Sequence, residues 1–422
     1  MNTYSHTRKF TLSGVIAALL GAPVTAAYAA EFGNGDLITS TIAGAVPRGG
    51  KMEGIRAGNY YIQPSVAAFT AFDDNIFSSS SDRISDIRTE LTPMLKFQSD
   101  FPRHVLDLSL AGKIVDYADH SEQNYANVSA DLKGALHFDH AHTLSLSVLS
   151  RLEHTELGAI TTPTAAAEPI PVFHNRASIG VTRDAGRLYG TVSATAERFD
   201  YSDVKATDGS IVDQDARDLD KYSAQLRTGY RFSPGYEIVG KITGLRQLNR
   251  GDTSGGQDAT GYEALAGLAF DTDPILHWHL MAGYGIRDFD DPSLDRIATS
   301  LLEADVVWEP TARMTITGSA ARMIVAALDQ DGDARVESSL VGAVTYEIWH
   351  NLTARAELAL IGADYTGNDR RDLSKRARVG LEYNFIENWS FTAGFEHQER
   401  DSNDDALDMT RNRVTIGAKL KF

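Results

Sequence analysis

From residue 60 onwards, apolar and polar residues alternate with a period of two in one stretch after another. In the last stretch, the even positions from Val414 to Phe422 are apolar, and the odd positions from Arg413 to Lys421 are polar or small. The same pattern recurs over 220–232, 351–365 and 373–385. Because successive side chains of a β-strand point to opposite faces, the pattern predicts strands with one apolar and one polar face.

Eighteen such strands are expected. They cover 60–72, 87–98, 104–117, 125–138, 142–154, 174–183, 187–201, 220–232, 236–249, 259–270, 275–289, 297–308, 312–326, 335–347, 351–365, 373–385, 389–400 and 409–422. Short turns and long loops alternate between them, which is typical of an outer-membrane barrel. The predicted fold is therefore all-β: a transmembrane, antiparallel, up-and-down β-barrel with both termini on the short-turn, periplasmic rim.

Aromatic residues gather at the expected strand ends. Those beside short turns include Phe138, Phe232, Tyr236, Trp308, Trp349, Phe385, Trp389 and Phe422. Those beside long loops include Phe72, Tyr117, Tyr125, Phe199, Tyr201, Tyr222, Phe289 and Tyr365. Since aromatic rings prefer the headgroup depth of a bilayer, these positions predict one aromatic belt at each interface.

The N-terminus has the pattern of an export signal. Arg8 and Lys9 precede the short apolar stretch Leu12–Leu20, and small residues surround Tyr28. This order matches a signal peptide cleaved near residue 29. The expected organisation is a signal peptide over 1–29, a periplasmic lead-in over 30–59 and the barrel over 60–422.

Composition narrows the alternatives. The 422 residues include no Cys, 40 Lys and Arg, and 57 Asp and Glu, for a net charge of −17. No disulfide or thiolate metal site is possible, and no basic footprint for a nucleic acid is expected. After the N-terminus no apolar run is long enough for a membrane-spanning helix.

The acidic excess lies in the predicted long loops. These nine loops hold 27 acidic and 7 basic residues, while the rest of the mature chain is almost neutral. Two interpretations stay open: a selective or Ca²⁺-bridged vestibule, and a solvated rim that divalent ions link to neighbouring lipopolysaccharide. Outer-membrane lipid and lipopolysaccharide are the expected surroundings.

The predicted inner face carries mixed charge, and an eighteen-stranded barrel is wide enough for an aqueous lumen. The basic residues expected to line the pore are Arg227, Arg231, Arg355, Arg376, Arg378, Arg411, Arg413 and Lys419. This cluster could guide an anionic solute, or it could form internal salt bridges.

Motifs for catalysis or metal binding are weak. Residues 329–333 resemble the start of a Ca²⁺ loop, but no Glu occupies the twelfth position. His277 and His279 share a face without a third ligand, and no nucleophile motif accompanies His137. We expect neither an enzyme nor a cofactor.

One N-terminal region resembles a known family. Gly54–Gly58, Tyr61–Ser65 and Phe72–Phe77, followed by Leu91-Thr-Pro93, are similar to the opening of the putative β-barrel porin 2 family. The resemblance implies an outer-membrane component of exopolysaccharide or capsule export in a Gram-negative bacterium. It also implies a polysaccharide substrate and periplasmic and inner-membrane export partners, with no catalytic residues. In the stretch Phe72–Phe77, Asp73 and Asn75 are expected to bond the backbone, and the two Phe to lie at the interface.

The sequence leaves three functions open. The first is a conduit for an exported polysaccharide, and the alternative is a general diffusion porin for small hydrophilic solutes. A diffusion porin should narrow its lumen with a long loop, for which 155–173 and 202–219 are the candidates. A third possibility is a plugged barrel, with Gly33–Gly58 as a strap in the lumen.

Overall fold

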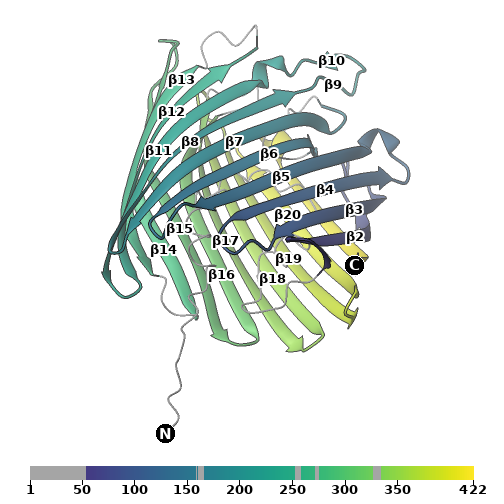
Figure 1. Ribbon diagram of the computed structural model, residues 1–422. Helices are drawn as coiled ribbons and strands as arrows, with labels where there is room; N and C mark the ends of the chain where they lie inside the picture. The colour runs from purple at the N-terminus through teal and green to yellow at the C-terminus, as the bar shows by residue number, and fades with distance from the viewer. Residues whose placement is uncertain (1–53, 158, 160–165, 252–257, 271–274, 327–333) are drawn as a thin grey trace.

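A computed structural model describes residues 54–157, 159, 166–251, 258–270, 275–326 and 334–422 (Figure 1). Eighteen antiparallel strands form one closed barrel, as the alternation predicted. The barrel strands are β2 (Tyr60–Asp73), β3 (Asp86–Ser99), β4 (Val105–Tyr117), β5 (Tyr125–His137), β6 (His142–Thr155), β7 (Ile170–Ala185), β8 (Leu188–Tyr201), β11 (Leu219–Ser233), β12 (Tyr236–Asn249), β13 (Ala259–Phe270), β14 (Leu276–Phe289), β15 (Ile297–Thr311), β16 (Met314–Ala326), β17 (Ala334–Trp349), β18 (Leu352–Thr366), β19 (Arg371–Ile386), β20 (Trp389–Ser402) and β21 (Met409–Lys421). The proposed signal peptide and most of the lead-in lie outside the described residues.

The barrel closes where β2 meets β21, in a ladder that runs from Ser65 opposite Lys421 to Asp73 opposite Arg413. Before it, the short strand β1 (Ile55–Ala57) folds back on β2. Gly54 and Gly58 have φ of 114° and 63°, a backbone conformation that glycine adopts most readily. A Cβ on Gly54 would lie 2.5 Å from the Ile62 carbonyl oxygen, so this turn needs the glycine.

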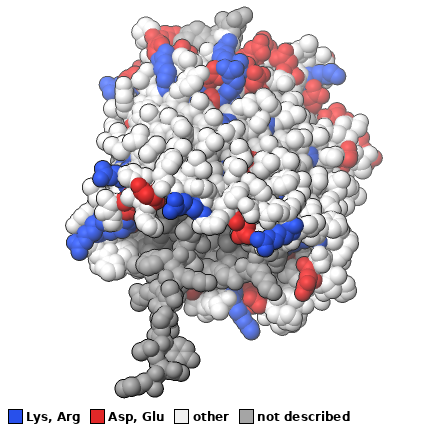
Figure 2. Space-filling view, viewed as in Figure 1, with Lys and Arg blue, Asp and Glu red and all other residues white. Residues whose placement is uncertain are grey.

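Alternation along β21 separates the two faces of the wall. Val414 and Ile416 are 50% and 62% exposed, whereas Arg411 and Arg413 are 2% and 4% exposed. Apolar side chains therefore face outwards and basic ones inwards, as predicted. Between charged zones near the two rims, the outer surface in Figure 2 carries a broad band without charge. The described chain contains no helix of sufficient length and apolarity to cross a membrane.

The aromatic prediction is right at one rim and partly wrong at the other. Beside the short turns, Phe138, Trp349 and Phe422 are outward and exposed. Beside the long loops, Tyr222 is also exposed. However, the side chains of Tyr117, Tyr125, Tyr201 and Tyr365 are buried on the inside, because structure within the lumen covers them.

The long loops contain elements that the alternation did not predict. Between β8 and β11 lies a small hairpin of β9 (Val204–Lys205) and β10 (Ile211–Val212), followed by the 3₁₀ turn η2 (Asp215–Arg217). Further 3₁₀ turns are η1 (Ser121–Gln123) and η3 (Asp405–Leu407). Strand β7 begins at Ile170, four residues earlier than expected, because Ile170 still pairs with Thr155 of β6.

The wall is not a simple cylinder between β15 and β16. These strands pair from Leu302 opposite Arg322 down to the short turn. Nearer the long loops, Ile297–Leu301 pair only with β14, and Met323–Ala326 pair only with β17. The two strands therefore separate over their loop-side ends.

Packing shows where the separated end of β16 lies. Ile324 and Val336 have the sequence parity of outward residues, yet they are 6% and 7% exposed and belong to one cluster with the inward residues Met281 and Leu301. Leu340, lower on the same face of β17, is 55% exposed. The loop-side ends of β16 and β17 thus pass inside β12–β15 and form a local sheet-on-sheet layer.

Candidate functional site

The inner faces of β18–β21 and β2–β4 carry a continuous set of charged side chains, which we call the ionic sector. Its members are Asp73, Arg88, Glu90, Lys113, Arg355, Glu357, Arg376, Arg378, Glu396, Arg411 and Arg413. They share one face because each lies at an inward position of a strand. Acidic and basic side chains alternate around this part of the wall, so most of them have an oppositely charged neighbour.

Asp73 forms one centre of the ionic sector. Its side chain is fully buried at the end of β2, with Oδ2 lying 2.5 Å from Nη2 of Arg411 and 2.9 Å from Nη2 of Arg413. Such charge-assisted hydrogen bonds are short and strong. Since β2 and β21 close the barrel, this cluster joins the first and the last strand of the barrel.

Glu156 connects the loop after β6 to the ionic sector. Its Oε1 lies 2.9 Å from Nη1 of Arg88 and accepts a hydrogen bond of 2.6 Å from the Tyr125 hydroxyl. Arg411 and Arg413 lie 3.5 and 3.7 Å from its Oε2. Burial alone would raise the pKa of the Glu156 carboxyl. The surrounding cations, Arg88 first among them, outweigh burial and hold this pKa well below its usual range.

The described parts of the same loop fold into the lumen. The Leu157 carbonyl accepts a hydrogen bond of 3.0 Å from Ser78, and the Ala159 carbonyl accepts one of 3.4 Å from Arg400 of β20. Strands β6 and β20 are not neighbours in the wall. The loop therefore crosses part of the lumen, as expected for a loop that narrows a porin.

The second predicted loop packs against the first. Ala166 forms an isolated bridge with Ala206, and the Lys205 amide donates 2.9 Å to Glu168. Gln123 of η1 donates 2.6 Å to the Ala167 carbonyl. Three loops thus support one another on the inner side of β4–β8.

The loop between β2 and β3 is the third inward element. As predicted, Asp73 accepts from the Asn75 amide at 3.1 Å, and the Asn75 side chain bonds the backbone of Ser79 and Thr410. The expectation for Phe77 is wrong. It packs with Ile76, Val115 and two tyrosines inside the barrel, while Phe72 is exposed on the outside.

The predicted pore-lining residues separate into two groups. Arg355, Arg376, Arg378, Arg411 and Arg413 come together in the ionic sector, where Arg378 pairs with Glu396 and Arg355 lies 3.1 Å from Glu357. Arg227, Arg231 and Lys419 lie elsewhere on inward positions, and Arg231 pairs with Asp184 and Glu237 near the short turns. No single site unites all eight.

Sequence reasoning did not identify Glu156 and Arg88 as partners. Arg88 has the parity of an inward strand residue, so the sequence did contain a signal that its side chain faces the lumen. Glu156 follows its strand directly and has no periodic signature, because its position depends on how the loop folds.

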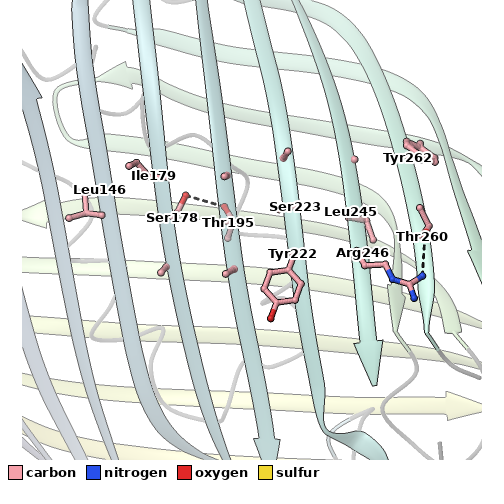
Figure 3. A pocket seen from close by; sticks show the side chains of 15 residues that line it. Leu146, Ser178, Ile179, Thr195, Tyr222, Ser223, Leu245, Arg246, Thr260 and Tyr262 are labelled. Atoms are coloured by element: carbon pink, nitrogen blue, oxygen red, sulfur yellow. Dashed lines mark hydrogen bonds between the residues drawn. The ribbon is translucent and has the colours of Figure 1, made fainter. Parts of the chain in front are cut away.

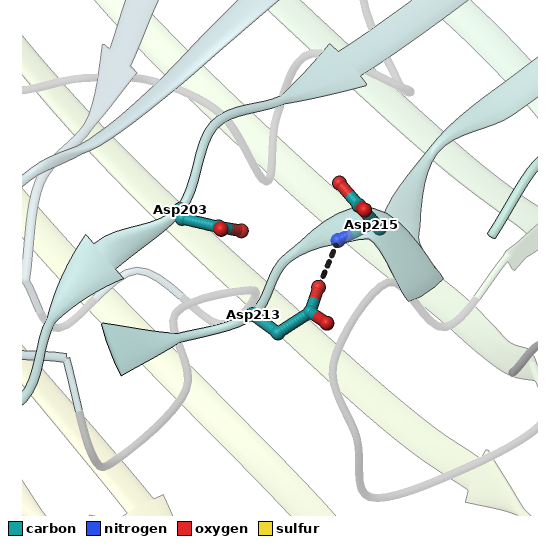
Figure 4. Close-up of side chains that lie close together, drawn as sticks. All are labelled: Asp203, Asp213 and Asp215. Atoms are coloured by element: carbon teal, nitrogen blue, oxygen red, sulfur yellow. Dashed lines mark hydrogen bonds between the residues drawn. The ribbon is translucent and has the colours of Figure 1, made fainter. Parts of the chain in front are cut away.

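Two further groups of acidic or histidine side chains lie close enough together to be candidate metal sites. Asp203, Asp213 and Asp215 place carboxylate oxygens within 4.8 Å of one another, but all three are exposed (Figure 4). His279 Nε2 lies 3.2 Å from Asp305 and 3.7 Å from Glu303, and Glu303 already pairs with Lys241. This second group resembles an internal ion-pair network. The Ca²⁺-like stretch 329–333 lies outside the described residues.

A groove of about 650 Å³ lies on the outer face of β6–β13 (Figure 3). Small residues such as Ala194, Ala224 and Gly244 form its floor, between Ile179 and Tyr262. These residues have outward parity, and the two large ones are half exposed. The groove is therefore on the lipid side and does not belong to the lumen.

Comparisons with known proteins give a family model and several similar solved structures. A family model described as "Putative beta-barrel porin 2" matches residues 48–422. Among solved structures, the outer membrane protein OpdK from Pseudomonas aeruginosa is 12% identical, with a TM-score of 0.44 over 86% of this chain and 99% of that chain. Pseudomonas aeruginosa OccK9 (OpdG) is 12% identical, with a TM-score of 0.47 over 88% and 100%. Acinetobacter baumannii OccAB3 is 10% identical, with a TM-score of 0.44 over 87% and 100%. No curated protein matches the chain.

Proposed function

The chain belongs to the putative β-barrel porin 2 family, and from this premise we propose that it is a channel for small hydrophilic solutes. It is an outer-membrane protein of a Gram-negative bacterium. The observation that carries the proposal is the loop after β6, which Glu156 anchors inside the lumen through Arg88 and Tyr125.

The inward elements favour this function over polysaccharide export, which was our first expectation. A polymer conduit needs a lumen that stays wide along its whole length. Here, the loops after β2 and β6 occupy one side, and the loop-side ends of β16 and β17 lie inside the wall on another. A lumen narrowed in this way is better suited to solutes that are a few ångströms across than to a polymer chain.

The ionic sector supports passage of polar solutes. Charged side chains keep the adjacent space hydrated, so a polar solute need not lose all its water when it enters. Opposed acidic and basic groups also hold the wall in one geometry through charge-assisted hydrogen bonds. Neither effect requires catalysis.

The test is permeation through the purified, refolded protein in lipid vesicles, with neutral sugars of increasing length. We expect mono- and disaccharides to enter and long oligosaccharides to be excluded. Glu156→Gln should release the loop, because it removes the charge that Arg88 binds. We expect a larger single-channel conductance and a higher size limit.

Glu168→Gln is the matched control, because it removes one carboxylate from the same loop at a half-buried position, where Glu168 accepts a hydrogen bond from the Lys205 amide and not from Arg88. It should leave the size limit unchanged. Equal passage of short and long oligosaccharides through the wild-type protein would favour the polymer conduit. Exclusion of even monosaccharides would overturn the channel.

A further inference from the structure

Three lysines lie close together on the inner wall near the short-turn rim. Lys419 and Lys421 of β21 are opposite Ala67 and Ser65 of β2, and Lys96 of β3 is opposite Gln63 on the other side of β2. These inward residues of β2 are small or uncharged. The three ammonium groups therefore flank one uncharged strip of the wall.

Among the described residues, these lysines form no ion pair. In the part of the chain that the structure describes, no carboxylate comes within 4.0 Å of any of the three ammonium groups. Glu382 attracts Lys419 only from beyond that distance. Lys421 is near enough to repel both Lys96 and Lys419.

The ionic sector provides the contrast. There, Arg411 and Arg413 share Asp73, and Arg88 binds Glu156. Even Lys133, which also repels Lys96, has Asp131 at 3.1 Å. Like charges that are gathered on a confined, half-buried wall raise its electrostatic energy unless an anion accompanies them.

We propose that Lys96, Lys419 and Lys421 form a subsite for the anionic oxygens of a carboxylate or phosphate, so that the channel prefers small anionic solutes. Each ammonium group offers three rotatable donors and one compact charge, which suits a mobile anion that must bind and leave again. This inference rests on the proposed channel function and adds its solute class.

The acidic long loops do not oppose this preference strongly. They lie at the other rim, where many of their carboxylates are exposed to solvent. Salt screens exposed charges over about 8 Å at physiological ionic strength, and it screens buried or confined charges much less. The lysines act inside the lumen, through which every permeating ion must pass.

The test is the reversal potential of single channels in a planar bilayer under a KCl gradient. We expect the wild-type channel to be anion-selective. The triple variant Lys96→Gln, Lys419→Gln, Lys421→Gln should lower the ratio of chloride to potassium permeability several-fold. Lys375→Gln is the matched control, because Lys375 pairs with Asp401 and Glu399 on the outer side of β19 and does not face the lumen.

Added inorganic phosphate and acetate distinguish the two sources of anionic oxygen. Either anion should produce brief current blocks in the wild-type channel that disappear in the triple variant, and the stronger blocker identifies the favoured group. A conducting channel whose selectivity the triple substitution does not change would overturn the subsite but leave the channel. A correctly inserted wild-type protein without conductance would overturn both.

Discussion

Two sectors of the inner wall are built from the same alternating pattern, but they are filled in different ways. In the ionic sector, inward charges pair with one another and with loop residues such as Glu156. In β12–β15, the inward residues Val239, Leu265, Met281 and Leu301 are apolar, and they pack in one buried cluster with the loop-side ends of β16 and β17.

This difference between a charged and an apolar inner wall indicates which part of the lumen holds water. Apolar side chains on an inner wall cannot face an aqueous channel without cost, so a second layer must bury them. Paired charges can border water. We infer that the passage follows the ionic sector, while the overlap of β16 and β17 with β12–β15 forms a dry core beside it.

Asp73→Ala gives the strictest test of the ionic sector. It removes the carboxylate nearest to the buried Arg411 and Arg413 and leaves them only their longer contacts with Glu156 and Glu396. Breaking a buried pair in this way costs about 3–5 kcal/mol. The measurement is the free energy of unfolding in urea, in lipid vesicles. Asp74→Ala is the control, because the Asp74 side chain accepts hydrogen bonds from Asn412 and forms no ion pair with Arg411 or Arg413. If both variants lose the same stability, the ionic sector is not held by its charges.

Met281→Ala tests the apolar sector in the same assay. Met281 is fully buried in the overlap, so its truncation should leave a cavity and cost about 2–5 kcal/mol. Met94→Ala removes the same atoms from a half-buried position on β3 and should cost less. Equal losses would show that β16 and β17 do not form a second layer over β12–β15.

Ile416→Arg tests the outer face that both sectors share. Ile416 is 62% exposed in the apolar band, and an Arg near the bilayer midplane should cost about 2–4 kcal/mol. Lys419→Glu, on the inner face of the same strand, should fold normally. Equal refolding yields and stabilities for the two variants would contradict the assignment of faces on β21.

The strands were predictable because a bilayer outside and polar groups inside impose a period of two on every segment. The same rule predicted the inward arginines of β18–β21. It could not predict that Glu156 would bind Arg88, or that Phe77 would pack inside. These contacts depend on how the loops fold across the lumen, and alternation contains no information about residues distant in sequence. The four loop-side tyrosines have inward parity, so their error came from the expectation of an aromatic belt and not from alternation. Alternation also did not predict that the loop-side end of β16 lies inside the wall. Ile324 and Val336 have the same parity as ordinary lipid-facing residues.

The final prediction concerns the pH range over which the loop after β6 stays in the lumen. Arg88 and its neighbours hold the pKa of Glu156 well below the usual 4.5, even though burial acts in the opposite direction. A carboxyl whose pKa is lower in the folded protein stabilises the fold fully above its free value. That contribution is lost only as the pH falls through the lowered pKa. The size limit for neutral oligosaccharides should therefore be the same at pH 7 and at pH 4.5. Neutral solutes make this a clean measurement, because protonation of the exposed rim carboxylates does not attract or repel them. A size limit that rises on acidification to pH 4.5 in the wild-type protein, towards that of Glu156→Gln, would show that the loop is released with an ordinary carboxyl pKa.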